Sequence, residues 1–283
     1  MVEPVQAKSK AEMQANKRVK ESGGIVEIVT IIVQALLIAL VVRTFLFQPF
    51  NIPSGSLIPT LEVGDYLFVS KYTYGYSRYS FPWGPNLFSG RVLGSPPKRG
   101  DIAVFKWPKD TSIDYIKRVI GLPGDKIRVA GGRLFINGTI VQRRQIGSYR
   151  TQDASGKEVE APYYEETLPG SDPAHPEVGT VTHRIIQIDG DSGYYDNWPR
   201  GDDPNKAYEV PPGEFLMMGD NRDNSLDSRN WGPVPFENLV GRAEIIFFSI
   251  KTVPGQGEET EPAWQFWRWP WTVRWNRLFQ PVR

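Results

Sequence analysis

The sequence predicts a mainly β protein, in which an N-terminal transmembrane helix precedes an antiparallel β domain that carries a smaller inserted β subdomain. Three observations indicate this fold class: one long apolar run near the N-terminus, several short runs of β-branched and aromatic residues, and turn-forming Gly and Pro between them. The 283 residues are enough for one sizeable core with a subdomain. The chain has no Cys, which excludes disulfides and thiol chemistry.

The first element is the apolar run from 28 to 42, IVTIIVQALLIALVV, which only Thr30 and Gln34 interrupt. If Arg43 extends toward the membrane surface, residues 24–47 reach the roughly 20 residues that a bilayer requires. A buried core helix would show more polar positions, and a cleavable secretory signal would end in small residues. Large residues follow this run instead, so the sequence predicts an uncleaved, single-span anchor over 24–47.

The charged residues before the anchor predict its orientation. Five cationic side chains stand against three acidic ones in residues 1–23; they are Lys8, Lys10, Lys17, Arg18 and Lys20 against Glu3, Glu12 and Glu21. Positive charge flanking a membrane span favours the cytoplasmic side. We therefore expect a cytoplasmic tail over 1–23 and the remainder of the chain outside the cytoplasm.

Short apolar runs after the anchor predict strands at 65–72, 101–107, 114–121 and 243–250. Residues 133–141 predict a hairpin, because their central Asn-Gly pair suits a type I′ turn. Gly-Asp pairs recur where turns would fall. The main β domain, expected to be the catalytic one, is predicted over 48–142 and 211–253. The polar residues 143–210 between these two parts are predicted to form a variable β subdomain.

The C-terminal tail, residues 254–283, is rich in Trp and Arg. Five of the nine Trp lie in it, with Arg interleaved: Trp264, Trp267, Trp269, Trp271 and Trp275, with Arg268, Arg274, Arg277 and Arg283. The tail is too charged and too short to span a bilayer. It suits either the lipid headgroup region or packing on the β domain, and both readings stay open. Nucleic acid is not an expected partner, since the domain faces away from the cytoplasm and the net charge is only +1.

The stretch PSGSLIPTL, residues 53–61, places Ser54 and Ser56 around a glycine directly after the anchor. A serine hydroxyl is a poor nucleophile until a base takes its proton. The two histidines, His175 and His183, lie in the polar middle of the chain and belong to no motif. If Ser56 is a nucleophile, its base must be another residue type.

Lys117 is the candidate base, because DYIKRVIGLPGD, residues 114–125, surrounds it with apolar residues. A strand places Tyr115, Lys117 and Val119 on one face. With an ordinary pKa of about 10.4, only about one lysine in a thousand is neutral near pH 7.4. Burial can lower that pKa by several units, and a Ser-Lys pair is a known variant of nucleophile and base. From spacing alone, however, a solvated strand lysine is the commoner outcome.

The stretch GDNRDNSLDSRNWG, residues 219–232, alternates acidic and basic side chains with Asn and Ser between them. This density predicts an ordered loop that is held by internal ion pairs and Asx turns; a solvated charged loop is the alternative. A calcium loop fits poorly, because Arg222 interrupts the run and a terminal Glu is absent. With no Cys and two His, a zinc site is also disfavoured. We expect neither a metal nor a cofactor.

These segments together, in this order behind an N-terminal span, resemble bacterial type I signal peptidases. The match runs from about Phe50 to Ala243 in five blocks: PSGSLIPTL, Gly-Asp at 64–65, RGDI with VF at 99–105, DYIKRVIGLPGD, and GDNRDNSLDSRNWG with VGRA at 240–243. Each block alone is weakly diagnostic, but the set is specific. The resemblance implies a membrane-bound serine endopeptidase that removes signal peptides from exported preproteins after small residues. It also implies the inner (cell) membrane, with the catalytic domain outside the cytoplasm. We expect a monomer.

The resemblance also implies roles for individual residues. Ser56 matches the nucleophile and Lys117 the general base, and the Ser56 amide with the Ser54 hydroxyl would form the oxyanion hole. Three residues match those that orient the lysine or support the site: Ser225, Asp227 and Arg229. Seven apolar residues fall where the family forms shallow substrate pockets: Phe50, Ile52, Leu57, Leu61, Val104, Tyr115 and Ile116.

One position departs from the family pattern. Met usually follows the nucleophile, whereas this chain has Leu57, which is similar in volume and still apolar. We expect the change to affect pocket shape rather than chemistry. Two other functions remain. A self-cleaving regulator would carry a DNA-binding domain where this chain has its anchor. A catalytically inactive, membrane-tethered β scaffold that binds exported proteins would need no combination of Ser56, Lys117 and Ser225.

Overall fold

The structure, a computed structural model, divides the chain into two units, Met1–Thr44 and Phe45–Arg283. It describes residues 6–283, of which 6–23 by backbone alone, except residues 83, 87, 154, 191, 192, 194–196, 202, 204, 205 and 254–258. Residues 1–5 of the predicted cytoplasmic tail and residues 254–258 of the predicted C-terminal tail therefore lie outside the description.

The N-terminal unit is helical. Helix α1 covers Gln6–Val41 and continues as one π-helical turn, η1 (Val42–Leu46). Within this unit, the segment Gly24–Leu46 has a mean hydropathy of 2.8, and none of its most apolar stretch is buried against the protein. By length and composition this segment can cross a membrane. The predicted anchor, 24–47, agrees with this segment to within one residue, since Phe47 begins the first strand.

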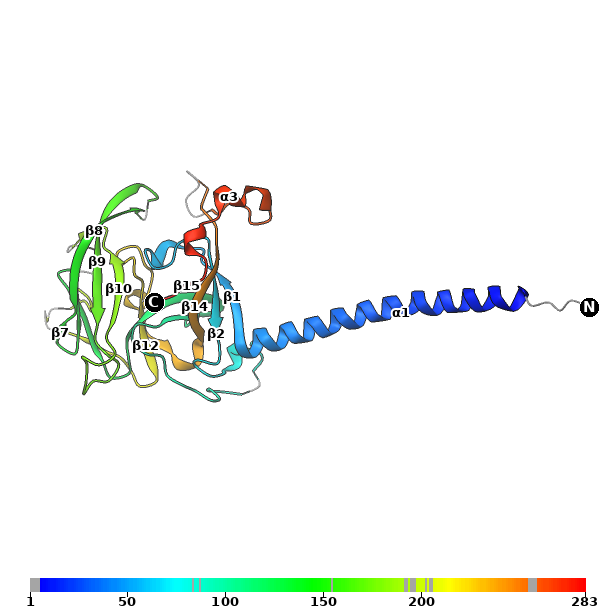
Figure 1. Cartoon of the computed structure of the whole chain (residues 1–283). Coiled ribbons are helices and arrows are strands. Elements are labelled where there is room, and N and C mark those ends of the chain that lie inside the picture. The colour runs from blue at the N-terminus through cyan, green and yellow to red at the C-terminus, as the bar shows by residue number, and fades with distance from the viewer. Residues whose placement is uncertain are drawn as a thin grey trace, which may run out of the picture. The chain divides into compact units, whose positions relative to one another are not determined.

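The second unit is built around an eight-stranded antiparallel sheet in the order β1-β2-β14-β3-β4-β12-β13, with β15 paired to β14 (Figure 1). Its strands are β1 (Phe47–Asn51), β2 (Asp65–Ser70), β3 (Ile102–Trp107), β4 (Asp110–Gly121), β12 (Glu214–Met218), β13 (Val234–Pro235), β14 (Leu239–Ser249) and β15 (Gln280–Pro281). Strands β2, β3, β4 and β14 correspond to the four predicted strands, although β4 and β14 each begin four residues earlier than predicted. The predicted mainly β, antiparallel fold is confirmed.

Two smaller antiparallel sheets complete this unit. One contains β8 (Gln142–Gln152), β9 (Glu158–Leu168) and β10 (Val181–Ile186), and the other β11 (Tyr208–Glu209), β5 (Lys126–Ala130), β6 (Arg133–Ile136) and β7 (Thr139–Ile140). The turn between β6 and β7 has positive φ at both Asn137 (53°) and Gly138 (80°), as a type I′ turn requires. The predicted hairpin is thus confirmed.

Short helices occupy the connections. They are η2 (Gly55–Leu57), η3 (Arg78–Ser80), α2 (Ser228–Trp231), η5 (Phe236–Asn238), η6 (Phe266–Arg268), α3 (Trp269–Thr272) and η7 (Trp275–Arg277). The large sheet is buried on both faces at β3, because Val104 packs in one apolar cluster and Phe105 in another. Strand β4 pairs with β3 along Asp110–Arg118 but with β12 only from Arg118 onward. Its preceding residues therefore keep an unpaired edge.

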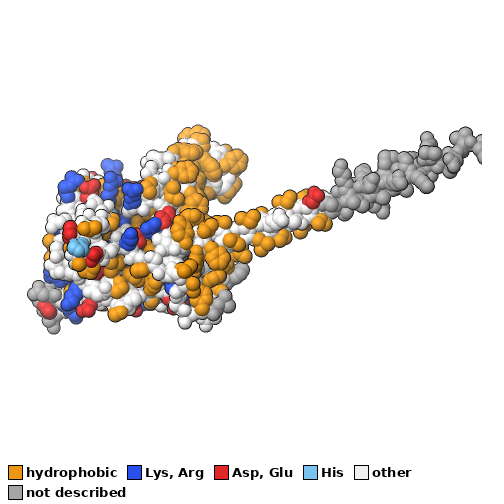
Figure 2. Space-filling model, turned by 60° about the horizontal axis from the view of Figure 1, so that its bottom comes forward, with side chains coloured by type: hydrophobic (Ala, Val, Ile, Leu, Met, Phe, Trp, Pro, Cys, Tyr) orange, Lys and Arg blue, Asp and Glu red, His pale blue; other side chains and the backbone are white. Residues whose placement is uncertain are grey.

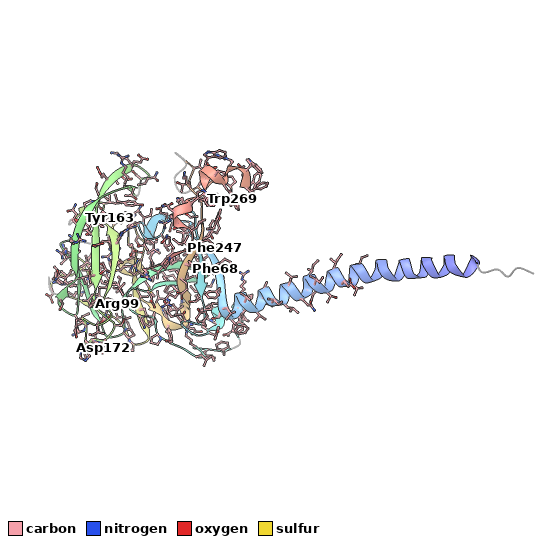
Figure 3. All side chains as sticks on the ribbon, viewed as in Figure 1. Phe68, Arg99, Tyr163, Asp172, Phe247 and Trp269 are labelled. Atoms are coloured by element: carbon pink, nitrogen blue, oxygen red, sulfur yellow. The ribbon has the colours of Figure 1, made fainter. Side chains whose placement is uncertain are left out.

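The C-terminal tail packs on the β domain through only part of its aromatic residues, and its contact with lipid headgroups stays a prediction. Trp269 packs on Phe248, with ring centroids 5.2 Å apart, and Val273 is 3% exposed. The other four Trp of the tail are at least 55% exposed. Figure 2 shows the hydrophobic side chains of the C-terminal tail in orange, where the tail projects from the β domain. Figure 3 places Trp269 on the same side of the large sheet as Phe68 and Phe247. Part of the tail is core, and the remainder presents aromatic rings to the surroundings.

Candidate active site

The turn that carries Ser56 is the single 3₁₀ turn η2, directly after β1. Ser54 precedes it in an extended conformation (φ −135°, ψ 152°) and is exposed, whereas Ser56 is only 9% exposed. Asn221 fixes this turn from the other side, because its amide N–H donates to the Ser56 carbonyl (3.1 Å) and its Nδ2 donates to the Gly55 carbonyl (3.3 Å). The Ser56 hydroxyl is therefore carried on a backbone that is held at both carbonyls.

Lys117 lies on β4 and meets this hydroxyl. Its Nζ donates to Ser56 Oγ at 2.7 Å and to the Ile116 carbonyl at 3.0 Å. Burial lowers the pKa of Lys117 from 10.5 to about 8, more than nearby Asp227 and Asp220 raise it. About a tenth of the lysines would then be neutral at pH 7. The structure brings the predicted nucleophile and base into direct contact, with the lysine in the environment that its proposed role requires.

The loop at 219–232 supports this pair. Asp227 caps α2, is fully buried, and accepts from Arg229 Nη2 (2.7 Å) and from the Gly219 amide (3.0 Å). Burial alone would raise the pKa of Asp227, but Arg229 and these hydrogen bonds lower it below its usual value. Asp227 and Arg229 therefore lie together as a charged pair beneath the site.

Ser225 is buried in the same loop. Its hydroxyl lies near enough to Asp227 to help lower the pKa of that carboxyl, but it makes no hydrogen bond to the lysine amine, whose partners among the described residues are the Ser56 hydroxyl and the Ile116 carbonyl. Gly219 separates Ser225 from the nucleophile turn: a Cβ at this glycine would overlap the Ser225 side chain and lie 2.5 Å from the Ser56 carbonyl oxygen. The lysine-orienting role of Ser225 stays a prediction.

Two further charged residues of the loop, Asp220 and Arg222, pair outside it rather than within the loop as predicted. Asp220 accepts from Arg118 Nε (2.8 Å) and Nη2 (2.7 Å), and Thr60 donates to the same carboxylate (2.6 Å). Arg222 pairs with Glu166 of β9. Among the described residues, the ion pair within the loop is that of Asp227 and Arg229. The loop is therefore tied to β4 and to the three-stranded sheet, through contacts that local sequence does not reveal.

Neither histidine contacts the nucleophile. His183 is 3% exposed and lies between Glu166 (3.4 Å) and Asp220 (3.8 Å). Burial, with the charges of Arg118 and Arg222, holds the pKa of His183 well below its usual value, so the ring is neutral. His175 is exposed, 3.7 Å from Glu177. This arrangement agrees with the expectation that the base for Ser56 is a residue other than histidine.

Six of the seven residues predicted for substrate pockets gather in one apolar cluster next to η2: Phe50, Ile52, Leu57, Leu61, Val104 and Ile116. Tyr115 belongs to the neighbouring cluster. Four of the six, including Leu57 at 1%, are almost completely buried, and only Phe50, Tyr115 and Ile116 keep accessible surface. Leu57 therefore offers almost no surface of its own to a substrate, and its effect on pocket shape stays a prediction.

Four residues that shape the site have no predicted role in the sequence: Arg118, Gly219, Asp220 and Asn221. The available signal was their place in the sequence, since Arg118 follows the candidate base and the other three begin the charged loop. Their partners lie far along the chain, 102 residues apart for Arg118 and Asp220 and 166 for Asn221 and Gly55. Spacing within a motif does not show such pairings.

Comparison with known proteins adds independent information. Signal peptidase I of Rickettsia prowazekii (strain Madrid E) is 38% identical over 84% of both chains. Signal peptidase I of Rickettsia typhi (strain ATCC VR-144 / Wilmington) is 41% identical over 76% of both. A solved signal peptidase I from Enterococcus faecalis V583 is 24% identical with a TM-score of 0.28, and the match covers 52% of this chain and 97% of the other.

The profile of one protein family matches most of the chain. It is described as "Signal peptidase, peptidase S26", and the match covers residues 25–248, which include Ser56, Lys117 and the charged loop. Together with the identities to the Rickettsia proteins, this extent is decisive. The chain belongs to the signal peptidase family, peptidase S26, and is a signal-peptide-cleaving serine endopeptidase.

Proposed function

We propose that this peptidase is anchored in the bacterial inner membrane and cleaves signal peptides by a Ser-Lys dyad, in which Ser56 is the nucleophile and Lys117 the general base. One observation carries the proposal: the Lys117 amine lies 2.7 Å from the Ser56 hydroxyl, and the lysine is buried with a lowered pKa. A general base must be within hydrogen-bond reach of the proton that it removes and must be deprotonated near working pH. Lys117 meets both conditions.

The reaction is acyl transfer. Neutral Lys117 accepts the Ser56 proton as Ser56 Oγ attacks the scissile carbonyl carbon, and the resulting ammonium protonates the leaving amine as the peptide bond breaks. Lys117 then removes a proton from a water molecule, which attacks the ester and releases the signal peptide as a carboxylate. The proton that Lys117 holds at the end returns to Ser56 Oγ.

The oxyanion of the tetrahedral intermediate would accept from the Ser56 amide and from the Ser54 hydroxyl. The exposure and extended backbone of Ser54 support this role, because its hydroxyl makes no hydrogen bond to a described residue and can donate to the substrate. The change Ser54→Ala should lower kcat by about 10²–10³ with little effect on KM. An unchanged kcat would remove Ser54 from the oxyanion hole.

The substrate is expected to bind as an extended strand. Strand β1 pairs only with β2, and β4 has an unpaired edge before Arg118, so both can add a strand by backbone hydrogen bonds. The accessible apolar surface at Phe50, Tyr115 and Ile116 is small and suits Ala-like residues of A-x-A type before the cut. These features support cleavage after small residues.

The membrane contributes by bringing enzyme and substrate together. The segment Gly24–Leu46 would span the bilayer with residues 1–23 in the cytoplasm. The exposed Trp of the C-terminal tail would lie at the headgroup level, where Trp and Arg are favoured. A substrate held in the same bilayer is presented at high effective concentration. The domain limits 48–142 with 211–253, and 143–210, are part of this proposal, as is a monomeric state.

The direct test is cleavage of a preprotein by the full-length enzyme in detergent, beside the variant Ser56→Ala. We expect wild type to release the signal peptide at the A-x-A site and the variant to bind the preprotein without cleaving it. Equal cleavage by both would remove Ser56 as nucleophile. Binding without cleavage by wild type would favour the scaffold alternative.

A further inference from the structure

A groove of about 640 Å³ opens beside the nucleophile turn. Gly55 and Ile58 line its floor, the β8–β9 hairpin at 149–158 forms one wall, and Thr252 and Arg274 lie in the opposite wall. The volume falls in the range of about 300–1,000 Å³ that ligand clefts occupy. Figure 1 shows this hairpin as the green ribbon that rises from β8 and β9. Because Gly55 separates Ser54 from Ser56, the groove begins at the reaction site.

The two walls differ in charge. On one wall Glu62 pairs with Arg274 at 3.2 Å, so these charges compensate each other. On the hairpin wall Arg150 and Glu158 are both exposed, and neither side chain makes an ion pair or hydrogen bond to any described residue. Asp153 also lines this wall, but its carboxylate accepts hydrogen bonds from the Ser155 hydroxyl and the Lys157 amide, so Arg150 and Glu158 are the charged groups of the hairpin that are left for whatever occupies the groove.

Asn221 and Asn224 connect the nucleophile turn to the hairpin. Asn224 Nδ2 donates to the Gln152 carbonyl at 3.4 Å, and Asn221 holds the carbonyls of Gly55 and Ser56. Asn221 lines the groove and is 1% exposed, yet its Oδ1 has no hydrogen-bond partner among the described residues. A buried acceptor without a partner is costly, and an N–H donor from a bound chain would satisfy it.

We propose that this groove binds the mature segment, the extended polar stretch of preprotein that follows the scissile bond, and that Arg150 and Glu158 discriminate between mature segments by charge. The inference rests on the proposed function. A peptide that crosses Ser56 must leave on the side opposite to its signal sequence. The accessible apolar residues Phe50 and Ile116 suit the signal side and do not line the groove, whereas the groove is polar and charged.

Location is tested with full-length Ser56→Ala in detergent and a preprotein peptide that carries a photoreactive residue at the third position after or the third position before the cut. We expect the mature-side probe to crosslink to residues 149–158 and the signal-side probe to crosslink elsewhere. Crosslinks of the mature-side probe outside the groove, or no crosslink at all, would overturn the inference. This measurement needs no turnover, so it is independent of the dyad.

Charge reading is tested with Glu158→Lys in the otherwise unchanged enzyme. The matched control is Glu177→Lys, which makes the same charge change in the connection between β9 and β10. That connection also contains Asp172, which Figure 3 shows at the opposite end of the three-stranded sheet from the hairpin tip. The readout is the ratio of kcat/KM for two peptides that differ only by Glu or Lys at the third mature position.

We expect Glu158→Lys to shift this ratio toward the Glu peptide by about three- to ten-fold. The reason is that residue 158 then attracts the Glu peptide and repels the Lys peptide, which reverses both exposed charge contacts. The control should leave the ratio unchanged, and 0.5 M salt should suppress the shift, since the Debye length falls to about 4 Å. An unchanged ratio in Glu158→Lys refutes charge reading while cleavage itself persists. If wild type cleaves neither peptide, the proposed function fails, and the crosslinks still decide the location.

Discussion

Two adjacent residues of β4, Lys117 and Arg118, are both buried cations, yet their surroundings differ completely. Arg118 is fully buried and donates to Asp220 twice, at 2.8 and 2.7 Å, and to the Gly100 carbonyl at 2.8 Å. Lys117 is 5% exposed and donates only to the Ser56 hydroxyl and the Ile116 carbonyl. One strand thus carries a compensated charge and an uncompensated one on successive residues.

The difference shows how a fold separates structure from chemistry. A buried charge that meets a carboxylate keeps its charge and fixes geometry, whereas one that meets only neutral groups loses its proton more easily. Because neighbouring strand residues point to opposite faces of the sheet, β4 can carry a structural cation, Arg118, on one face and the candidate base, Lys117, on the other. Arg118 ties the charged loop to the sheet, and this fixes the position of Lys117.

The sharpest test of the comparison is Lys117→Met. Cleavage should fall by at least about 10⁴-fold, because the serine loses its base. The free energy of unfolding should rise by on the order of 2 kcal/mol at pH 7, since an uncompensated buried cation is removed. Preprotein cleavage and chemical denaturation in detergent measure the two effects. A variant that is both inactive and less stable would show that Lys117 is structural.

The opposite result is expected for Asp220→Ala. Removing this carboxylate leaves Arg118 buried without its counter-charge, which should lower the free energy of unfolding by about 3–5 kcal/mol. The matched control is Asp114→Ala, because Asp114 pairs with Lys106 at 2.9 Å on the exposed part of β4 and should contribute less than about 1 kcal/mol. Denaturation of the full-length chain compares them. Equal losses would mean that burial does not distinguish the two pairs.

The parts of this molecule that sequence predicts are those specified locally. The anchor follows from one apolar run, and the β6–β7 hairpin follows from Asn137-Gly138, where both residues adopt positive φ. The pairing of Ser56 with Lys117 could be proposed because the five sequence blocks together are specific to the family, although each block alone is weakly diagnostic. For the anchor and the hairpin, the residues that determine the feature are neighbours in the sequence, whereas Ser56 and Lys117 are 61 residues apart and were paired only through the family resemblance.

The rest depends on contacts between distant segments. The apolar neighbours of Lys117 suggest burial, but its lowered pKa requires that β4 be covered by β3 and by the loop at 219–232. The alternating charges of that loop indicated ion pairs within it, but Arg222 pairs instead with Glu166, which lies 56 residues away. The groove beside Gly55 gave no sequence signal, because the β8–β9 hairpin that forms its wall begins almost ninety residues later. Propensity and spacing do not determine which strands meet.

The smallest expected effect, and the most direct measure of the uncompensated lysine, is the pH dependence of kcat/KM. In the proposed mechanism neutral Lys117 is the reactive form, and because burial lowers its pKa to about 8, the rate should rise about tenfold per pH unit below pH 8 and level off above it.

Stability should change over a related range. Because the folded pKa lies below the unfolded value of about 10.5, the cost of burying the lysine is fully present below pH 8 and disappears as pH rises from 8 to 10.5. Lys117→Met should lack this rise in stability, which separates the lysine from other groups that titrate there. A rate that stays flat from pH 6 to 9, or a midpoint near 10, would mean that Lys117 is as well compensated as Arg118.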